Sequence, residues 1–101
     1  MGKVYLIGTI TVTHPEGYQA YSAAVPQTVA AAGGRYLVRG GAATLLEGNK
    51  LGERHVVIEF PSREAALNWY HSAAYQAILP HRTHHSTGTL ELVDGYEAPP
   101  A

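Results

Sequence analysis

The chain has 101 residues, of which 46% are hydrophobic and only 15% carry a charge, and its formal net charge is −1. This length predicts a single domain over residues 1–101, and a near-neutral chain without a run of like charge argues against nucleic acid or an anionic membrane as its partner. The absence of cysteine excludes disulfides, a thiol nucleophile and thiolate metal sites. The apolar runs are too short to span a bilayer and no signal-peptide pattern is present, so we expect a soluble cytoplasmic protein.

The first predicted element is a strand over residues 4–12, whose nearly continuous apolar sequence is typical of a strand buried on both faces. A helix follows, because Thr13 and Glu16 have the spacing of a capping box, with His14 as the alternative cap. Pro26 lies inside this helix, removes one backbone N–H and is expected to kink it. The inner stripe of the helix comprises Tyr18, Tyr21, Val25, Val29 and Ala32.

The sequence GGRYLVRGG at 33–41 predicts a strand with a glycine pair at each end, the first of which ends the helix. Strand alternation places Tyr36 and Val38 on one face, and Arg35, Leu37 and Arg39 on the other. The second glycine pair allows a bulge or bend, beyond which residues 42–47 can continue the pairing. A turn is expected over 47–52.

Residues 53–60 predict a third strand, followed by a helix that Ser62 caps. The apolar face of the strand comprises Val56, Ile58 and Phe60, and the opposite face His55, Val57 and Glu59. The inner stripe of the helix comprises Ala66, Trp69, Tyr70 and Ala73. A further short helix is expected to stop at Pro80. Residues 87–93 predict the last strand, and residues 97–101 a frayed tail.

The order strand, helix, strand, strand, helix, strand predicts an α+β, ferredoxin-like βαββαβ fold. Such a fold has a four-stranded antiparallel sheet with two helices on one face. The other face, to which alternation assigns Leu37 and Val57, has no cover in a chain of this size. We therefore expect a homodimer joined through the helix-free sheet face.

Several blocks of the chain resemble the domain-of-unknown-function 1330 family. They are VTHPEGYQAY at the first helix, GGRYLVRGG at 33–41, LEG at 46–48, RHVVIEFPSREAALNWYHSAAYQ at 54–76 and HR at 81–82. The resemblance implies a dimeric α/β-barrel fold, in a superfamily that also holds cofactor-free monooxygenases, polyketide-cyclase-like and muconolactone-isomerase-like enzymes. It implies no particular activity, because fold alone does not specify one.

Arg39 is the first candidate functional residue, because an arginine in mid-sheet that faces a dimer or barrel interior needs an anionic partner. Glu59 on the next strand, or Glu47 in the turn, could form a structural ion pair with it. Alternatively, its guanidinium binds the carboxylate or enolate oxygen of a small ligand. Arg82 either is a solvated charge or closes one end of a small cavity between the helices and the sheet.

Four aromatic residues of the two helical regions are expected to face one another: Tyr21, Trp69, Tyr70 and Tyr75. They either form plain core packing or line a small cavity, in which their hydroxyls and the indole N–H meet water or a ligand.

Three histidines, His81, His84 and His85, follow Pro80 in a predicted loop. Without a fixed scaffold or a nearby acidic ligand we expect no metal there, although a helical arrangement would align them for one. A catalytic base such as His84 is the other possibility, because histidine titrates near neutral pH.

These observations favour a small dimeric protein that acts without a cofactor on a small organic acid, lactone or polyketide-like substrate. The catalytic candidates are Arg39, Tyr70, Arg82 and His84, and the ligand-binding candidates are Tyr21, Glu47, Glu59, Trp69 and Tyr75. No dinucleotide fingerprint, phosphate-binding loop or nucleophile elbow is present in the sequence. The alternative is a non-catalytic dimer that binds a small ligand or only assembles, with the arginines in structural pairs. In the first case the expected partner is a small organic anion. In neither case do we expect nucleic acid or a membrane as a partner.

Overall fold

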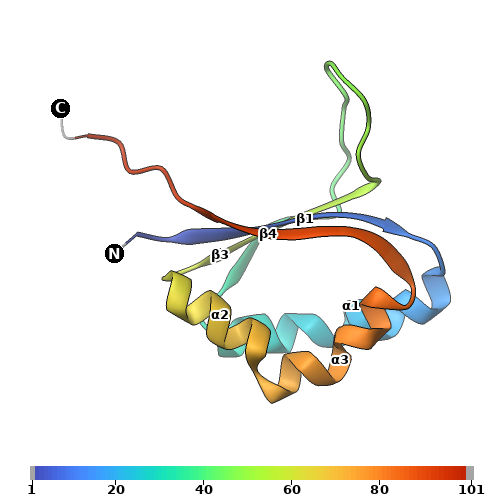
Figure 1. The fold of residues 1–101 in the computed structure, drawn as a ribbon, viewed down its shortest axis with the longest axis horizontal. Coiled ribbons are helices and arrows are strands. Elements are labelled where there is room, and N and C mark those ends of the chain that lie inside the picture. The colour runs from blue at the N-terminus through green and yellow to red at the C-terminus, as the bar shows by residue number, and fades with distance from the viewer. Residues whose placement is uncertain (1, 100–101) are drawn as a thin grey trace.

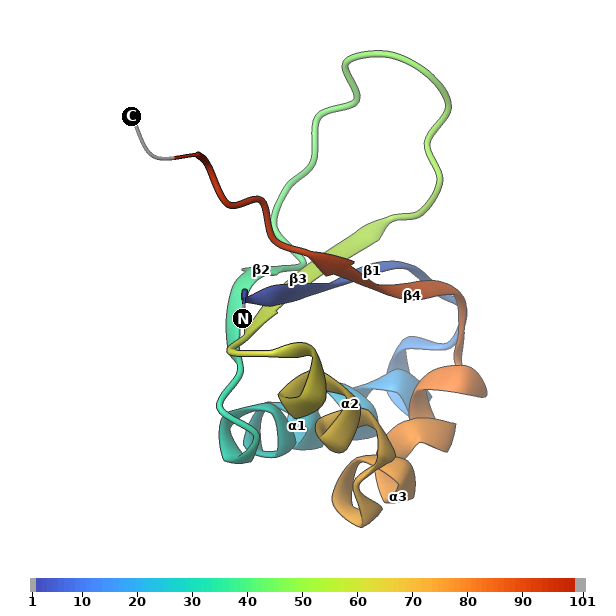
Figure 2. The same cartoon turned by 60° about the vertical axis from the view of Figure 1, so that its left-hand side comes forward.

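The computed structural model describes residues 2–99, which form a sheet with helices on one of its faces (Figures 1 and 2). The elements are β1 (Val4–Val12), α1 (Pro15–Ala31), β2 (Arg35–Arg39), β3 (Arg54–Phe60), α2 (Arg63–His71), α3 (Ala73–Thr83) and β4 (Ser86–Asp94). The strands form one antiparallel sheet in the order β2-β3-β1-β4. This arrangement confirms the predicted α+β, ferredoxin-like βαββαβ fold, with the second helical region divided into α2 and α3.

Side-chain caps fix where the helices begin. The Nδ1 atom of His14 accepts a hydrogen bond from a main-chain N–H in the first turn of α1, so His14 and not Thr13 is the cap. Ser62 caps α2 as predicted, by accepting a hydrogen bond from a first-turn amide at 3.0 Å. Ser72 both ends α2 and caps α3, which explains why one predicted helical region becomes two helices.

Helix α3 continues through Pro80, so the prediction that the helix stops there is wrong. Proline lacks only its own N–H, and its carbonyl still accepts a hydrogen bond from the N–H of His84 at 2.9 Å. The last helical turn therefore closes, and the predicted histidine loop is instead the end of a helix with His84 as its C-cap.

The core lies between the helices and the covered face of the sheet. The register of β1 directs Leu6 to the helices and its neighbour Ile7 to the open face; Leu6 is 5% exposed and Ile7 is 36% exposed. The expectation that β1 is buried on both faces is therefore wrong for the single chain. Phe60 and Trp69 are central to the core, with ring centroids 5.4 Å apart.

A bulge in β2 changes which residues face the helices. The register pairs are Arg35 with Glu59, Tyr36 with Ile58, Val38 with Val57, and Arg39 with Val56. Leu37 is thus an extra residue, and beyond it the alternation is inverted. Val38 lies on the open face and Arg39 on the helix side, so the predicted assignment of both residues to faces is wrong.

Residues 40–53, here called the arm, contain no strand and leave the sheet on the side away from the helices (Figure 1). The predicted continuation of pairing over 42–47 is therefore wrong. The arm exposes three leucines: Leu45, Leu46 and Leu51. Residues 95–99 have no regular structure, and the rest of the predicted tail, 100–101, lies outside the described residues.

Within residues 2–99, no helix has the length and apolar character needed to cross a membrane.

Candidate functional site

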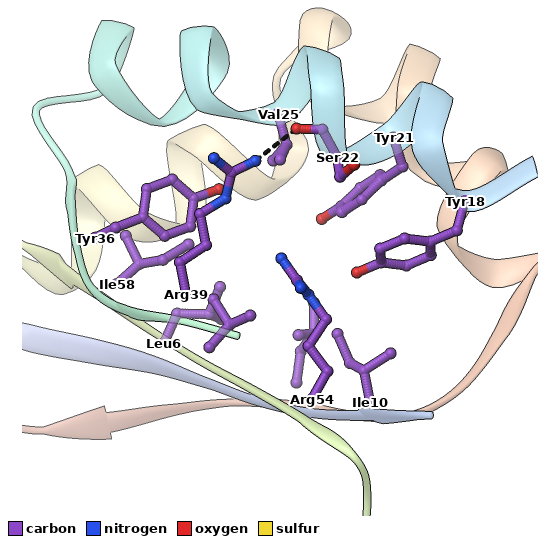
Figure 3. Close-up of a pocket in the computed structure, with 12 residues that line it drawn as sticks. Leu6, Ile10, Tyr18, Tyr21, Ser22, Val25, Tyr36, Arg39, Arg54 and Ile58 are labelled. Carbon is purple, nitrogen blue, oxygen red and sulfur yellow. Dashed lines mark hydrogen bonds between the residues drawn. The ribbon is translucent and has the colours of Figure 1, made fainter. Parts of the chain in front are cut away.

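A hollow between α1 and the sheet brings arginines and tyrosines together. Arg39 extends from the sheet toward Ser22 on α1, and Arg54 extends toward Tyr18 and Tyr21 on the same helix (Figure 3). The apolar walls include Leu6, Ile10, Val25, Val56, Ile58 and Leu90. The cavity volume is about 30 Å³, which is room for water and not for an organic molecule unless a side chain moves.

Arg39 lies at the mouth of this hollow because of the bulge in β2. Its Nη2 donates a hydrogen bond to the carbonyl oxygen of Ser22 on α1 at 2.6 Å, and its guanidinium carbon lies 5.0 Å from the ring centroid of Tyr36. The predicted pair with Glu59 does not form, because Glu59 is on the open face of the sheet. There Arg35 takes the predicted structural role, with its Nε donating to Glu59 at 2.9 Å.

Arg54 is a site residue that the sequence analysis missed. Its guanidinium carbon lies 6.0 Å from the ring centroid of Tyr18, and its Nε is buried without a hydrogen-bond partner among the described residues. A signal for it was present, because strand alternation places residue 54 on the same face as Val56 and Ile58. A charged residue on an apolar strand face indicates a functional or paired group.

Tyr21 and Tyr75 form a buried hydroxyl pair with an oxygen–oxygen distance of 2.8 Å. Burial and the neighbouring Tyr75 raise the pKa of Tyr21 far above its usual value, so Tyr21 stays protonated, and either hydroxyl of the pair can be the donor. Arg82 lies beside the pair, with its guanidinium carbon 5.8 Å from the ring centroid of Tyr21. Burial acts to lower the pKa of Arg82, but the attraction of the two tyrosine oxygens outweighs it and raises that pKa.

A second, larger hollow lies between the α2–α3 region and the β4 edge of the sheet. Its volume is about 440 Å³, and Trp69, Tyr70, His71 and Arg82 contribute to its lining. Leu6 and Leu90 line both hollows, so the two are neighbours along the covered face of the sheet. The indole N–H of Trp69 donates to the hydroxyl of Thr28 on α1 at 2.9 Å, which fixes the ring at the boundary between helices and sheet.

The three arginines of these hollows have no acidic partner. Within residues 2–99 the ion pairs are Lys3 with Glu59, Arg35 with Glu59, and Arg63 with Asp94. No carboxylate among these residues therefore lies within 4.0 Å of Arg39, Arg54 or Arg82. The Nε atom of Arg82, like that of Arg54, is buried without a hydrogen-bond partner in the described chain. Together the hollows form a positively charged site with tyrosine hydroxyls as neutral donors.

The structure places the other predicted site residues elsewhere. Glu59 is on the open sheet face, Glu47 is exposed in the arm, and His84 is exposed at the end of α3. The Nδ1–H of His85 donates to the carbonyl oxygen of His81, 2.8 Å away, and the His85 ring centroid is 5.3 Å from that of His14. No group of three potential metal ligands forms within the described residues.

The arrangement suits the binding and stabilisation of an oxyanion. Guanidinium groups and tyrosine hydroxyls are the donors that stabilise a carboxylate or a developing enolate in a site that excludes water. Among the lining residues, His71 supplies an imidazole and Tyr70 a second hydroxyl, both at the larger hollow. The site therefore contains groups that donate hydrogen bonds to an anion and groups that can transfer a proton.

Comparisons with known proteins agree on the fold. A protein of unknown function from Rhodopseudomonas palustris has a TM-score of 0.76 at 17% identity, over 96% of this chain and 85% of that chain. SnoaB, a cofactor-independent oxygenase from Streptomyces nogalater, has a TM-score of 0.64 at 15% identity, over 100% of both chains. An antibiotic biosynthesis monooxygenase has a TM-score of 0.55 at 18% identity, over 98% of this chain and 100% of that chain. At such identities the likeness shows the fold alone.

A comparison with curated proteins gives no match. The model of one family, however, matches residues 3–96, which is most of the chain. The chain therefore belongs to the family described as a domain of unknown function, DUF1330.

Proposed function

We propose that the chain binds a small organic anion, a carboxylate or the enolate of a carbonyl compound, in the hollows between its helices and sheet, and transforms it without a cofactor. The observation that carries this proposal is the group of Arg39, Arg54 and Arg82, which surround tyrosine hydroxyls and have no carboxylate within 4.0 Å among residues 2–99. An arginine in a structural role normally pairs with an acid, as Arg35 does with Glu59.

The guanidinium groups of Arg54 and Arg82 are partly buried. Removing a charged group from water is costly unless a partner of opposite charge or a hydrogen-bond acceptor replaces the water. The Nε atoms of Arg54 and Arg82 are buried and lack a partner in the described chain. An anionic ligand that spans the two neighbouring hollows, with a side chain moved to open the smaller one, would supply acceptors to both. The planar fork of arginine suits a carboxylate.

The reaction class that fits these groups is proton removal next to a carbonyl group. Charge then develops on the carbonyl oxygen, where the Arg82 guanidinium, which lines the larger hollow, can donate to it. We assign His71 as the proton acceptor and Tyr70 as a donor, because both line the larger hollow. The description of SnoaB as a cofactor-independent oxygenase supports catalysis without a cofactor on this fold.

Calorimetric titration tests the binding site. Acetate, malonate, acetoacetate, salicylate and inorganic phosphate form a panel of small anions that differ in size and shape. We expect at least one of the carboxylates to bind, and Arg54→Gln to weaken that binding about tenfold or more, which is the effect of losing one charged hydrogen bond. Arg63→Gln is the matched control, because Arg63 pairs with Asp94 outside the hollows. Absence of binding across the panel, or equal binding by both variants, would contradict the proposal.

We also propose that two copies pair through the open face of the sheet. That face presents Ile7, Val38 and Val93 as exposed apolar side chains, and the arm with its exposed leucines projects from the same side (Figure 1). An exposed apolar surface of this kind marks an interaction site. A second copy presents the same surface, which makes a two-fold symmetric contact possible.

Sedimentation equilibrium of wild type and of Ile7→Glu tests this pairing. We expect a dimer for wild type and a monomer for the variant, because the introduced carboxylate would be buried in the contact. A wild-type monomer at about 100 µM, a concentration well above the dissociation constant of a stable dimer, would disprove the pairing. A dimer that binds no anion would instead favour the non-catalytic, purely assembling alternative.

A further inference from the structure

The Ser22 carbonyl that Arg39 binds is one that α1 cannot use itself. In an α-helix the carbonyl of residue i accepts a hydrogen bond from the N–H of residue i+4. The residue four positions after Ser22 is Pro26, which lies inside α1 and has no N–H. The helix therefore has no amide of its own for this acceptor.

Arg39 supplies the missing donor. Its Nη2 donates to the Ser22 carbonyl oxygen at 2.6 Å, across the mouth of the smaller hollow (Figure 3). The carbonyl has a charged donor in place of a helix amide, and such a hydrogen bond is stronger than a neutral one. Only one nitrogen of the guanidinium is used in this bond, so the others are left for a ligand.

We propose that Pro26 is a positioning residue, which acts through the Ser22 carbonyl to hold the Arg39 guanidinium over the hollow in the ligand-free protein. The proposal rests on the anion-binding function proposed above. Arg39 is an exposed residue, and a mobile arginine loses considerable rotamer freedom when it orders on a ligand. The bond to Ser22 and the contact with the Tyr36 ring order it before the ligand arrives, which favours binding.

The alternatives for Pro26 predict other outcomes. If proline only bent or weakened the helix, its replacement would change stability without involving Arg39. If the Ser22 carbonyl instead competed with the ligand for Arg39, replacement of Pro26 would strengthen anion binding. Pro26→Ala restores an N–H that can donate to the Ser22 carbonyl, and it removes only the apolar contacts of the proline ring. It therefore separates these cases.

A double-mutant cycle tests the coupling between the two residues. Salicylate, the panel anion with a planar carboxylate on a ring, is titrated into wild type, Pro26→Ala, Arg39→Gln and the double variant. We expect Pro26→Ala to weaken binding about two- to tenfold, the effect of ordering one long side chain. In the Arg39→Gln background the same replacement should have no effect. Unchanged or tighter binding in Pro26→Ala, or an equal loss in both backgrounds, would overturn the proposal.

A ligand-free measurement separates this proposal from the proposed function. The heteronuclear NOE of the Arg39 Nε–Hε group should fall in Pro26→Ala, because the side chain loses part of its anchor. Pro80→Ala, which replaces the proline inside α3, is the matched control and should leave that signal unchanged. If wild type binds no anion in the panel, the function proposal fails, whereas a fall in the Arg39 signal would still support the positioning by Pro26. An unchanged Arg39 signal would overturn it whatever the binding result.

Discussion

Two arginines of one short strand, Arg35 and Arg39, have opposite roles because they lie on opposite faces of the sheet. Arg35 donates to Glu59 at 2.9 Å on the open face, where Lys3 lies 3.7 Å from the same carboxylate and the hydroxyl of Tyr5 donates to it at 3.2 Å. Arg39 faces the helices and binds a backbone carbonyl, with no carboxylate in reach among residues 2–99. The open face thus provides a carboxylate for its cations, whereas the arginines of the covered face have none within 4.0 Å among residues 2–99.

This difference shows how a single residue can separate structural from functional charge. In a regular strand, residues 35 and 39 share a face; the bulge at Leu37 inverts the alternation and places Arg39 on the face opposite Arg35. A cluster that satisfies its own charges stabilises a fold or an interface. A cluster of like charges without partners raises the affinity for an anion.

The largest expected effect is on the free energy of unfolding, when an apolar side chain is truncated on the covered face and not on the open face. Leu6→Ala on the covered face should lower the free energy of unfolding by about 2–5 kcal/mol, because it leaves a cavity in the core next to both hollows. Ile7→Ala on the open face should lower it by less than about 1 kcal/mol in dilute protein, because Ile7 is 36% exposed there. Urea unfolding of both variants measures this. Under the proposed dimer, the effect at Ile7 grows with protein concentration; equal losses at dilution would mean that the single chain buries both faces.

Replacement of each arginine in turn tests whether the two faces differ in function. Arg39→Gln removes one guanidinium from the smaller hollow and the charged donor of the Ser22 carbonyl. We expect anion binding about tenfold or more weaker in calorimetry, the equivalent of one charged hydrogen bond. Arg35→Gln is the control, because Arg35 pairs with Glu59 on the open face. An equal loss of binding in both variants would show that the sheet face does not decide the role of each arginine.

The architecture could be predicted from local patterns, and the failures have identifiable physical causes. The apolar runs and glycine pairs predicted β1 and β2 with their observed bounds, since these signals are local to each element. Alternation in β2 failed after Tyr36 because a bulge depends on how β2 pairs with β3, which is information from two distant segments. The end of α3 was misjudged because the last turn forms around the Pro80 carbonyl, which proline retains.

The candidate site was predictable in its residue types more than in its geometry. Five predicted residues line the hollows: Tyr21, Arg39, Trp69, Tyr70 and Arg82. Tyr75, which was also predicted to bind a ligand, is fully buried and lines neither hollow. Glu59 was assigned to the wrong arginine as a consequence of the bulge. Arg54 was missed although alternation placed it on the apolar face of β3, where a charge is unexpected.

Alkaline unfolding tests the covered face of the sheet through the buried Tyr21 hydroxyl. The raised pKa of Tyr21, caused first by burial, means that its hydroxyl ionises more readily in the unfolded chain, near the usual value of about 10. The contribution of this group to stability is therefore complete below about pH 10 and is lost as the pH rises above it. Urea unfolding at several pH values between about 9 and 11 should show stability falling with a steeper slope in wild type than in Tyr21→Phe. Identical slopes would show that this hydroxyl is accessible to solvent.

Acid unfolding tests the open side, where we expect the smallest effect because the charges are near water. The hydrogen bond from Arg35, followed by that from Tyr5, holds the pKa of Glu59 below its usual value of 4.5. A lowered pKa in the folded chain stabilises it at pH values above 4.5, and this stabilisation is lost as the pH falls through the folded value. Wild type should therefore be more stable than Glu59→Gln at neutral pH, with a difference that shrinks on acidification, and anion binding should be unaffected because Glu59 lies on the face away from the hollows. If Glu59→Gln weakened salicylate binding as strongly as Arg39→Gln, the two faces would be coupled, and the separation of structural from functional arginines would fail.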